Sequence, residues 1–158
     1  MARLEDNPDF VRRREELAHQ QRLVEAQLRA EEEPLLAELA DVGIVINSVW
    51  DLVNSKSAYT AAIPVLVRHL RVPYSPRIRE GIIQSLAVPE ARGHAGWEIL
   101  EELKINNTSD QQVRWALANS LTVLADASMT VEIQSLISNP SCKDVRAILN
   151  TALKKMAV

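Results

Sequence analysis

The stretch Val113–Leu121, with the sequence VRWALANSL, decides the fold, because two other segments repeat its pattern. Ile78–Leu86 (IREGIIQSL) and Val145–Leu153 (VRAILNTAL) align with it without gaps, at intervals of 35 and 32 residues. Each copy has a β-branched residue, an arginine, a large aliphatic residue three positions after the arginine, and a small residue followed by leucine. A period in the thirties is the length of one helix–turn–helix unit, so the chain is predicted to repeat such units.

Helix-start signals precede all three copies. Ser75 stands before Pro76, Ser109–Gln112 has capping-box spacing, and Ser141–Asp144 has a similar form. Each copy is therefore predicted to be the second helix of a pair. The first helices are predicted at residues 61–70, 97–103 and 129–137. A weaker fourth copy is predicted at Asp41–Leu52, with Val45 in the place of the arginine.

Composition supports a helical class. The chain has four glycines and 4% aromatic residues, and its Leu, Ala, Glu, Arg and Gln residues recur at helical spacing. Strands need more turn residues and more β-branched or aromatic runs than this. The fold class is therefore predicted to be all-α.

The second-helix copies resemble the HEAT-repeat family, whose second helix typically has an aspartate three residues before a Val-Arg pair. Asp110, Val113 and Arg114 match this pattern best, whereas Ser75 and Cys142 replace the aspartate in the other strong copies. The resemblance implies a short right-handed α-solenoid of HEAT-like helix pairs whose second helices line a concave surface. The repeat domain is predicted to span residues 41–158, with about three full repeats and one partial repeat.

Residues 1–40 lie outside the repeat. Phe10, Leu17 and Val24 recur at intervals of seven, but the intervening positions are polar, which argues against a stable coiled coil. We expect an amphipathic helix that ends near Glu33, begins again at Pro34, and caps the N-terminal end of the stack.

Charge and cysteine content narrow the functional classes. The formal net charge is −3 and the pI about 5.7, which argues against binding to nucleic acid. No apolar run is long enough to span a membrane, and the N-terminus lacks the features of a signal peptide. Because Cys142 is the single cysteine, no internal disulfide can form, and a cytoplasmic location is expected.

A row of partner-binding residues is predicted on the second helices. With 100° per residue, positions one and five residues after the arginine point away from the core. These positions give the candidate row Trp50, Glu80, Gln84, Trp115, Asn119 and Thr151. Two of its members are tryptophans. They either bind a partner or pack in the fold, beneath the N-terminal helix or against a neighbouring repeat, and both interpretations stay open.

Other candidates are assigned structural roles. Arg79, Arg114 and Arg146 lie beside the core face and are predicted to bridge adjacent repeats through carboxylates or backbone carbonyls. Trp97 is predicted to join the core with Leu100 and Leu103. The acidic residues near the start of that helix are predicted to form a solvated outer face. They are Glu90, Glu98, Glu101 and Glu102.

No catalytic residue, cofactor or metal site is predicted. His19, His69 and His94 lack ligand spacing, and no nucleophile or nucleotide-binding motif occurs. The leading hypothesis is a non-catalytic scaffold or adaptor that binds a protein partner on the concave face. The alternatives are a homo-oligomer subunit and a HEAT-like DNA glycosylase that removes alkylated bases. The glycosylase would use Trp50, Asp51, Arg114 and Trp115 in its groove.

Overall fold

A computed structural model describes residues 3–105 and 110–156, and every regular element within these ranges is a helix. The chain begins with a one-turn 3-10 helix, η1 (Leu4–Asp6), and a long helix, α1 (Pro8–Asp41). Next come the single turn α2 (Trp50–Val53), the 3-10 turn η2 (Thr60–Ala62) and α3 (Ile63–His69). The predicted all-α class is confirmed for the described residues.

The remaining described residues form five α-helices and three 3-10 helices. Helix α4 (Pro76–Leu86) is followed by η3 (Pro89–Ala91), α5 (Gly96–Ile105) and α6 (Gln111–Leu124). Then come η4 (Ala127–Met129), α7 (Thr130–Ser138), η5 (Pro140–Val145) and α8 (Arg146–Met156). The sequence copies correspond to α4, α6 and α8, and the predicted first helices correspond to α3, α5 and α7.

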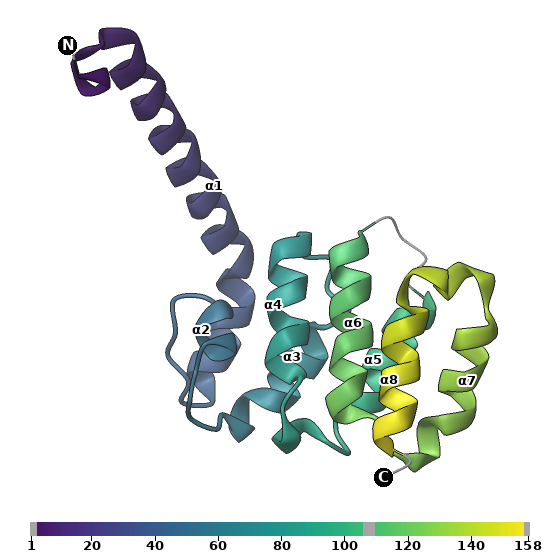
Figure 1. Cartoon of the computed structure of the whole chain (residues 1–158). Helices are drawn as coiled ribbons and strands as arrows, with labels where there is room; N and C mark the ends of the chain where they lie inside the picture. The colour runs from purple at the N-terminus through teal and green to yellow at the C-terminus, as the bar shows by residue number, and fades with distance from the viewer. Residues whose placement is uncertain (1–2, 106–109, 157–158) are drawn as a thin grey trace.

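The helices are arranged in two rows. Helices α3, α5 and α7 pack against α4, α6 and α8 respectively, and α6 also packs between α4 and α8 (Figure 1). At the N-terminal end, α1 contacts α3 and α2 contacts α4. One row therefore consists of α2, α4, α6 and α8, and the other of α1, α3, α5 and α7.

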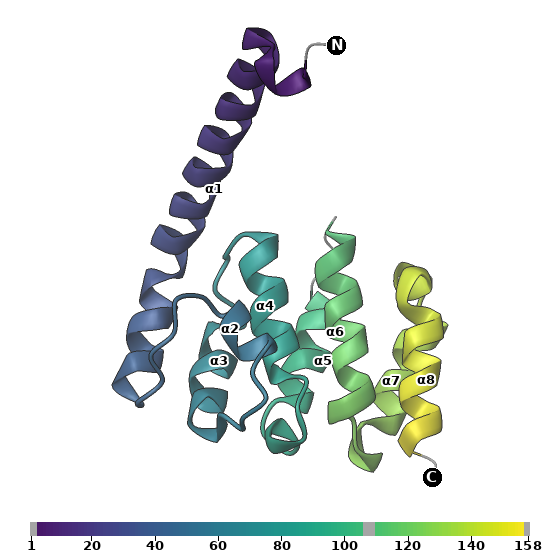
Figure 2. The same ribbon diagram turned by 60° about the vertical axis from the view of Figure 1, so that its left-hand side comes forward.

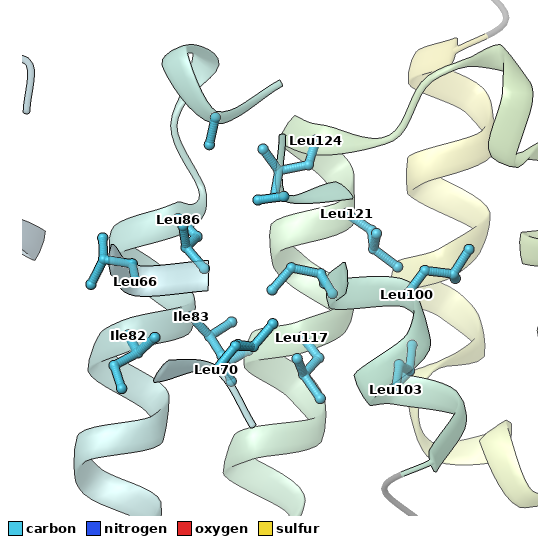
Figure 3. Packing of buried hydrophobic residues seen from close by; sticks show 14 of the residues in the cluster. Leu66, Leu70, Ile82, Ile83, Leu86, Leu100, Leu103, Leu117, Leu121 and Leu124 are labelled. Carbon is cyan, nitrogen blue, oxygen red and sulfur yellow. The ribbon is translucent and has the colours of Figure 1, made fainter. Parts of the chain in front are cut away.

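The core lies between the rows and follows the sequence pattern. In the second helices, the positions before the arginine and three after it are fully or almost fully buried, as with Ile78 and Ile82 or Val113 and Leu117. Figure 3 shows leucines and isoleucines of α3 to α6 directed into this shared layer. Burial of one such side chain contributes about 1.5–3 kcal/mol, so the repeated pattern holds neighbouring pairs together.

Helix starts differ in detail from those predicted. The Asp110 side chain caps α6 by accepting a hydrogen bond from the Val113 amide at 3.0 Å. Ser109, in the predicted capping box, lies outside the described residues. The hydroxyl of Ser75 is buried and makes no cap bond to α4; the Ser75 amide instead donates to the Glu31 carboxylate of α1.

The fourth copy is not a helix, so that prediction is wrong. α1 ends at Asp41, and regular helix resumes only for the single turn of α2. Gly43 follows the helix end with φ of 87°, a left-handed conformation that glycine adopts without steric cost. The segment between α1 and α2 includes Val45, which is 84% exposed.

The N-terminal helix also departs from its prediction. α1 does not begin again at Pro34 but runs through it, with the proline on an exposed side. Only its C-terminal part packs against the domain, through Leu35 and Leu39, which are fully buried. Every residue from Pro8 to Gln27 is exposed, and this half projects away from the other helices (Figures 1 and 2). Only the last turns of α1 are therefore packed against the helix pairs.

Candidate functional site

Five of the six predicted binding residues lie on the second helices. Glu80 and Gln84 occupy α4 and are joined by a hydrogen bond of 3.1 Å from the Gln84 amide to the Glu80 carboxylate. Trp115 and Asn119 lie four residues apart on α6 and are exposed, with Trp115 at 38%. Thr151 is exposed on α8, where its hydroxyl donates to the Ala147 carbonyl oxygen at 3.1 Å.

A hollow of about 240 Å³ lies between α4 and α6 and brings part of this row together. Gln84 contributes from α4 and Asn119 from α6, so two polar side chains of the row share one depression. Its remaining lining residues are Val53, Ala87, Ala116 and Ser120. The last three are small, which is why a hollow forms where the helices meet. Sequence reasoning missed them because small residues also mark close helix packing.

Trp50 lies elsewhere, because the helix that would have aligned it with the row does not form. It begins α2, and its indole Nε1 donates to the Arg77 carbonyl oxygen at 3.2 Å. The Arg77 guanidinium lies over the ring, 4.4 Å from its centroid, a cation–π geometry. The ring also approaches Gly81 so closely that a Cβ there would lie 3.0 Å from Nε1. Trp50 thus packs on α4 as a half-buried residue.

A second cavity, of about 430 Å³, borders Trp50 at the junction of α1, α2 and α4. Its charged lining is mixed, with Arg29 and Arg77 opposed by Glu25, Glu32 and Asp51. Two of these carboxylates are engaged in the fold. Asp51 accepts from the amides of Asn47 and Ser48, and the buried Glu32 accepts from the Ser48 hydroxyl and the Val49 amide. This lining includes Trp50 and Asp51 but neither Trp115 nor Arg114, so the residues of the glycosylase alternative do not share it.

The three arginines have different environments. Arg79 of α4 donates to Glu102 of α5 at 3.0 Å, and Arg114 of α6 pairs with Asp144 of η5. Each of these bonds joins one helix pair to the next. Arg146 instead donates from Nε to the Ile137 carbonyl oxygen, 2.9 Å away in α7 of its own pair. The expected bridge between repeats is therefore not made by Arg146, whose helix is the last of the row.

Arg114 has the most buried side chain of the three arginines. Arg114 is 6% exposed, and its Nε and Nη2 donate to the two Asp144 oxygens at 2.8 and 3.1 Å. Nη2 also donates to the Ser141 carbonyl oxygen at 3.1 Å. The hydrogen bonds from Arg114 lower the pKa of Asp144, and those to Asp144 raise the pKa of Arg114. Two-point pairing of this kind fixes the relative orientation of the two side chains in addition to bringing opposite charges together.

Two sequence interpretations of α5 are corrected. Trp97 is 43% exposed and does not join the core, although Leu100 and Leu103 are buried. Glu102, expected on a solvated face, is 6% exposed and lies 3.7 Å from Arg71 Nε as well as bonding Arg79. Glu98 and Glu101 keep partly exposed side chains, paired with Arg71 and Lys104.

A chain of hydrogen bonds that passes through the buried His69 joins α1 to α3 and the segment after it. His69 is 7% exposed; its Nε2 lies 2.7 Å from the Glu38 carboxylate, and its Nδ1 lies 2.7 Å from the Tyr74 hydroxyl. Because a carboxylate can only accept, Nε2 donates to Glu38, and in the neutral ring Nδ1 accepts from Tyr74. The hydrogen bond from His69 lowers the pKa of Glu38. A lone histidine in the sequence gave no signal of this contact.

Among the described residues, no cluster of three His, Cys, Asp or Glu side chains is placed to hold a metal ion. Cys142 is buried, with Sγ 3.9 Å from the Ser141 hydroxyl. Within the same ranges, no helix is both long enough and apolar enough to cross a membrane.

Comparison with known proteins gives no match: neither a family model, nor a curated protein, nor a solved structure is similar to this chain.

Proposed function

We propose that the protein is a non-catalytic scaffold or adaptor that binds a protein partner on the face formed by α4, α6 and α8. The proposal treats the helix pairs as a short right-handed, HEAT-like α-solenoid with these second helices on its concave side. Its binding row is Glu80, Gln84, Trp115, Asn119 and Thr151. Trp50 is left out of the row because its ring packs on α4. A cytoplasmic location is part of the same proposal.

The exposed side chain of Trp115, one turn before Asn119 on α6, is the observation that carries the proposal. An indole that is 38% exposed leaves a large apolar surface in water. Tryptophan is enriched among the residues that dominate binding energy. Asn119, one turn further along α6, lines the hollow with Gln84 of α4. Two amide groups therefore share the hollow, and the apolar anchor lies one helical turn from one of them. A peptide segment or loop could place one side chain in this hollow and donate or accept hydrogen bonds at its rim.

Affinity capture with two tryptophan variants tests the proposal. Trp115→Ala removes the anchor, and a central anchor typically contributes about 2 kcal/mol or more, or roughly a thirtyfold change in the dissociation constant. The matched control is Trp97→Ala, since Trp97 is similarly exposed but lies on α5, in the other row. We expect the native protein and Trp97→Ala to retain the same partner and Trp115→Ala to lose it while staying folded. Loss of the partner only in Trp97→Ala would move the site to the opposite face.

A further inference from the structure

The projecting half of α1 carries an apolar stripe that no other part of the described chain covers. Phe10, Leu17 and Val24 are 39%, 60% and 54% exposed. Counted at 100° per residue, Leu17, Val24 and Leu28 all lie within about 40° of Phe10 on the helix surface. A helix surrounded by water receives little of the tertiary packing that stabilises most protein helices. This stripe is therefore an incomplete interface.

The stripe is continuous with an interface that the fold already uses. Leu35 and Leu39 lie on the same helix face as Phe10 and are fully buried against the domain. Leu28 is half-buried at the point where the helix leaves the domain. Apolar residues thus recur along one face of α1, interrupted by polar residues such as Arg14 and Gln21. This face is packed at its C-terminal end and exposed in the N-terminal half of the helix, which projects away from the other helices (Figure 2).

We propose that a second copy of the chain covers this stripe, through antiparallel pairing of the two projecting helices. In this register Phe10 of one copy lies opposite Leu28 of the other, and Leu17 lies opposite Gln21. Arg14 then lies against Val24 and beside Glu25 of the other copy. Each layer combines one apolar residue with a second apolar or long polar side chain. The resulting dimer is weak and reversible, because polar residues within a helix seam lower its stability.

Charge selects the antiparallel direction. Arg14 and Glu25 lie on the same flank of the stripe, about 20° apart around the helix. Antiparallel pairing brings Arg14 of each copy beside Glu25 of the other, which gives two such contacts, one at each end of the overlap. Parallel pairing in register would instead place Arg14 opposite Arg14 in the seam, where like charges repel. This inference concerns a surface separate from the proposed binding row and does not depend on it.

Sedimentation velocity of the full chain over a range of concentrations tests the pairing. Native protein should show a reversible monomer–dimer equilibrium. Leu17→Lys should raise the dimer dissociation constant about tenfold or more, because it replaces a leucine buried in the seam. Leu23→Lys is the matched control: Leu23 is 52% exposed, close to the 60% of Leu17, but lies about 120° away from it around α1, outside the stripe. Both positions are exposed in the single chain, so neither change should unfold it.

Charge reversal tests the direction. Arg14→Glu and Glu25→Arg should each weaken the dimer, and the double variant should restore it. A native protein that remains monomeric at its solubility limit would overturn the proposal. So would equal weakening by Leu17→Lys and Leu23→Lys. Two weakening single variants without recovery in the double variant would overturn the antiparallel register.

Discussion

Arg114 and Asp144 join consecutive helix pairs through two parallel hydrogen bonds, of 2.8 and 3.1 Å. Arg114 lies in the first turn of α6, and Asp144 lies in η5, just before α8. A third bond, to the Ser141 carbonyl oxygen, places the arginine against the backbone of the same segment. The contact therefore fixes how η5 enters α8, in addition to pairing two charges.

Arg114→Ala should lower the free energy of unfolding by about 1–3 kcal/mol, since it leaves a carboxylate and a carbonyl without their buried donor. Chemical denaturation measures this change. Arg146→Ala is the matched control, because Arg146 has the same place in its sequence copy but is exposed and donates to one carbonyl oxygen of its own pair. Its effect should stay within about 0.5 kcal/mol. Equal effects of the two substitutions would contradict a special role of the bridge.

Acid should destabilise the protein through Glu38 and Asp144. Hydrogen bonds from His69 and Arg114 hold the pKa values of these groups below their ordinary values of 4.5 and 3.8. A carboxyl whose pKa is lowered by folding stabilises the folded state above its unfolded pKa. That stabilisation is lost as the pH falls through the folded pKa. Thermal unfolding followed from neutral pH to below pH 4 should therefore show a falling melting temperature.

Asp144→Asn separates the contribution of one group. This variant should be less stable than the native protein at neutral pH but should lose less stability on acidification, because its amide does not titrate. Glu16→Gln, at an exposed position of α1, should follow the native curve. An unchanged acid dependence in Asp144→Asn would show that the ion pair does not contribute to it.

The sequence predicted the three helix pairs because its pattern repeats where the packing repeats. Ile78, Val113 and Val145 hold the same helical position, and all three are buried. The prediction that Trp97 joins the core with Leu100 and Leu103 was wrong for a geometric reason. A spacing of three residues turns back by about 60° each time, so Trp97 lies about 120° from Leu103 around the helix and reaches the surface.

Contacts between segments far apart in the chain also could not be predicted from the sequence. Glu102 reads as one of several acids on α5, and only the fold shows that Arg79 of the preceding pair reaches it. His69 likewise has no pattern in sequence that points to Glu38, 31 residues earlier. The exposed half of α1 could not be told from the docked half, because both have the same apolar spacing.

Gly81→Ala should destabilise the protein, although alanine normally favours a helix interior by about 0.5–1 kcal/mol over glycine. An added Cβ would lie 2.6 Å from Val49 Cγ1, which is too close for either atom to remain in place. Overpacking of this kind costs about 1–3 kcal/mol. Adding Val49→Ala removes the clashing atom, so the double variant should be more stable than the sum of the two single effects predicts. Additive effects would mean that the backbone moves instead.

Trp50 and Trp115, the two tryptophans of the predicted row, should respond differently to truncation. Trp50 packs its ring against α4 and Arg77 and donates a hydrogen bond from Nε1, so Trp50→Ala removes packing and leaves the Arg77 carbonyl without its donor. We expect a loss of at least about 2 kcal/mol. Trp115→Ala should cost less than about 1 kcal/mol, because over a third of that residue is already exposed. Denaturation curves give both values, and acrylamide quenching of single-tryptophan variants checks the cause: Trp115 should be quenched more readily than Trp50. A protected, blue-shifted Trp115 whose truncation is strongly destabilising would show that its indole is needed for the fold, and the proposed binding row would lose its anchor.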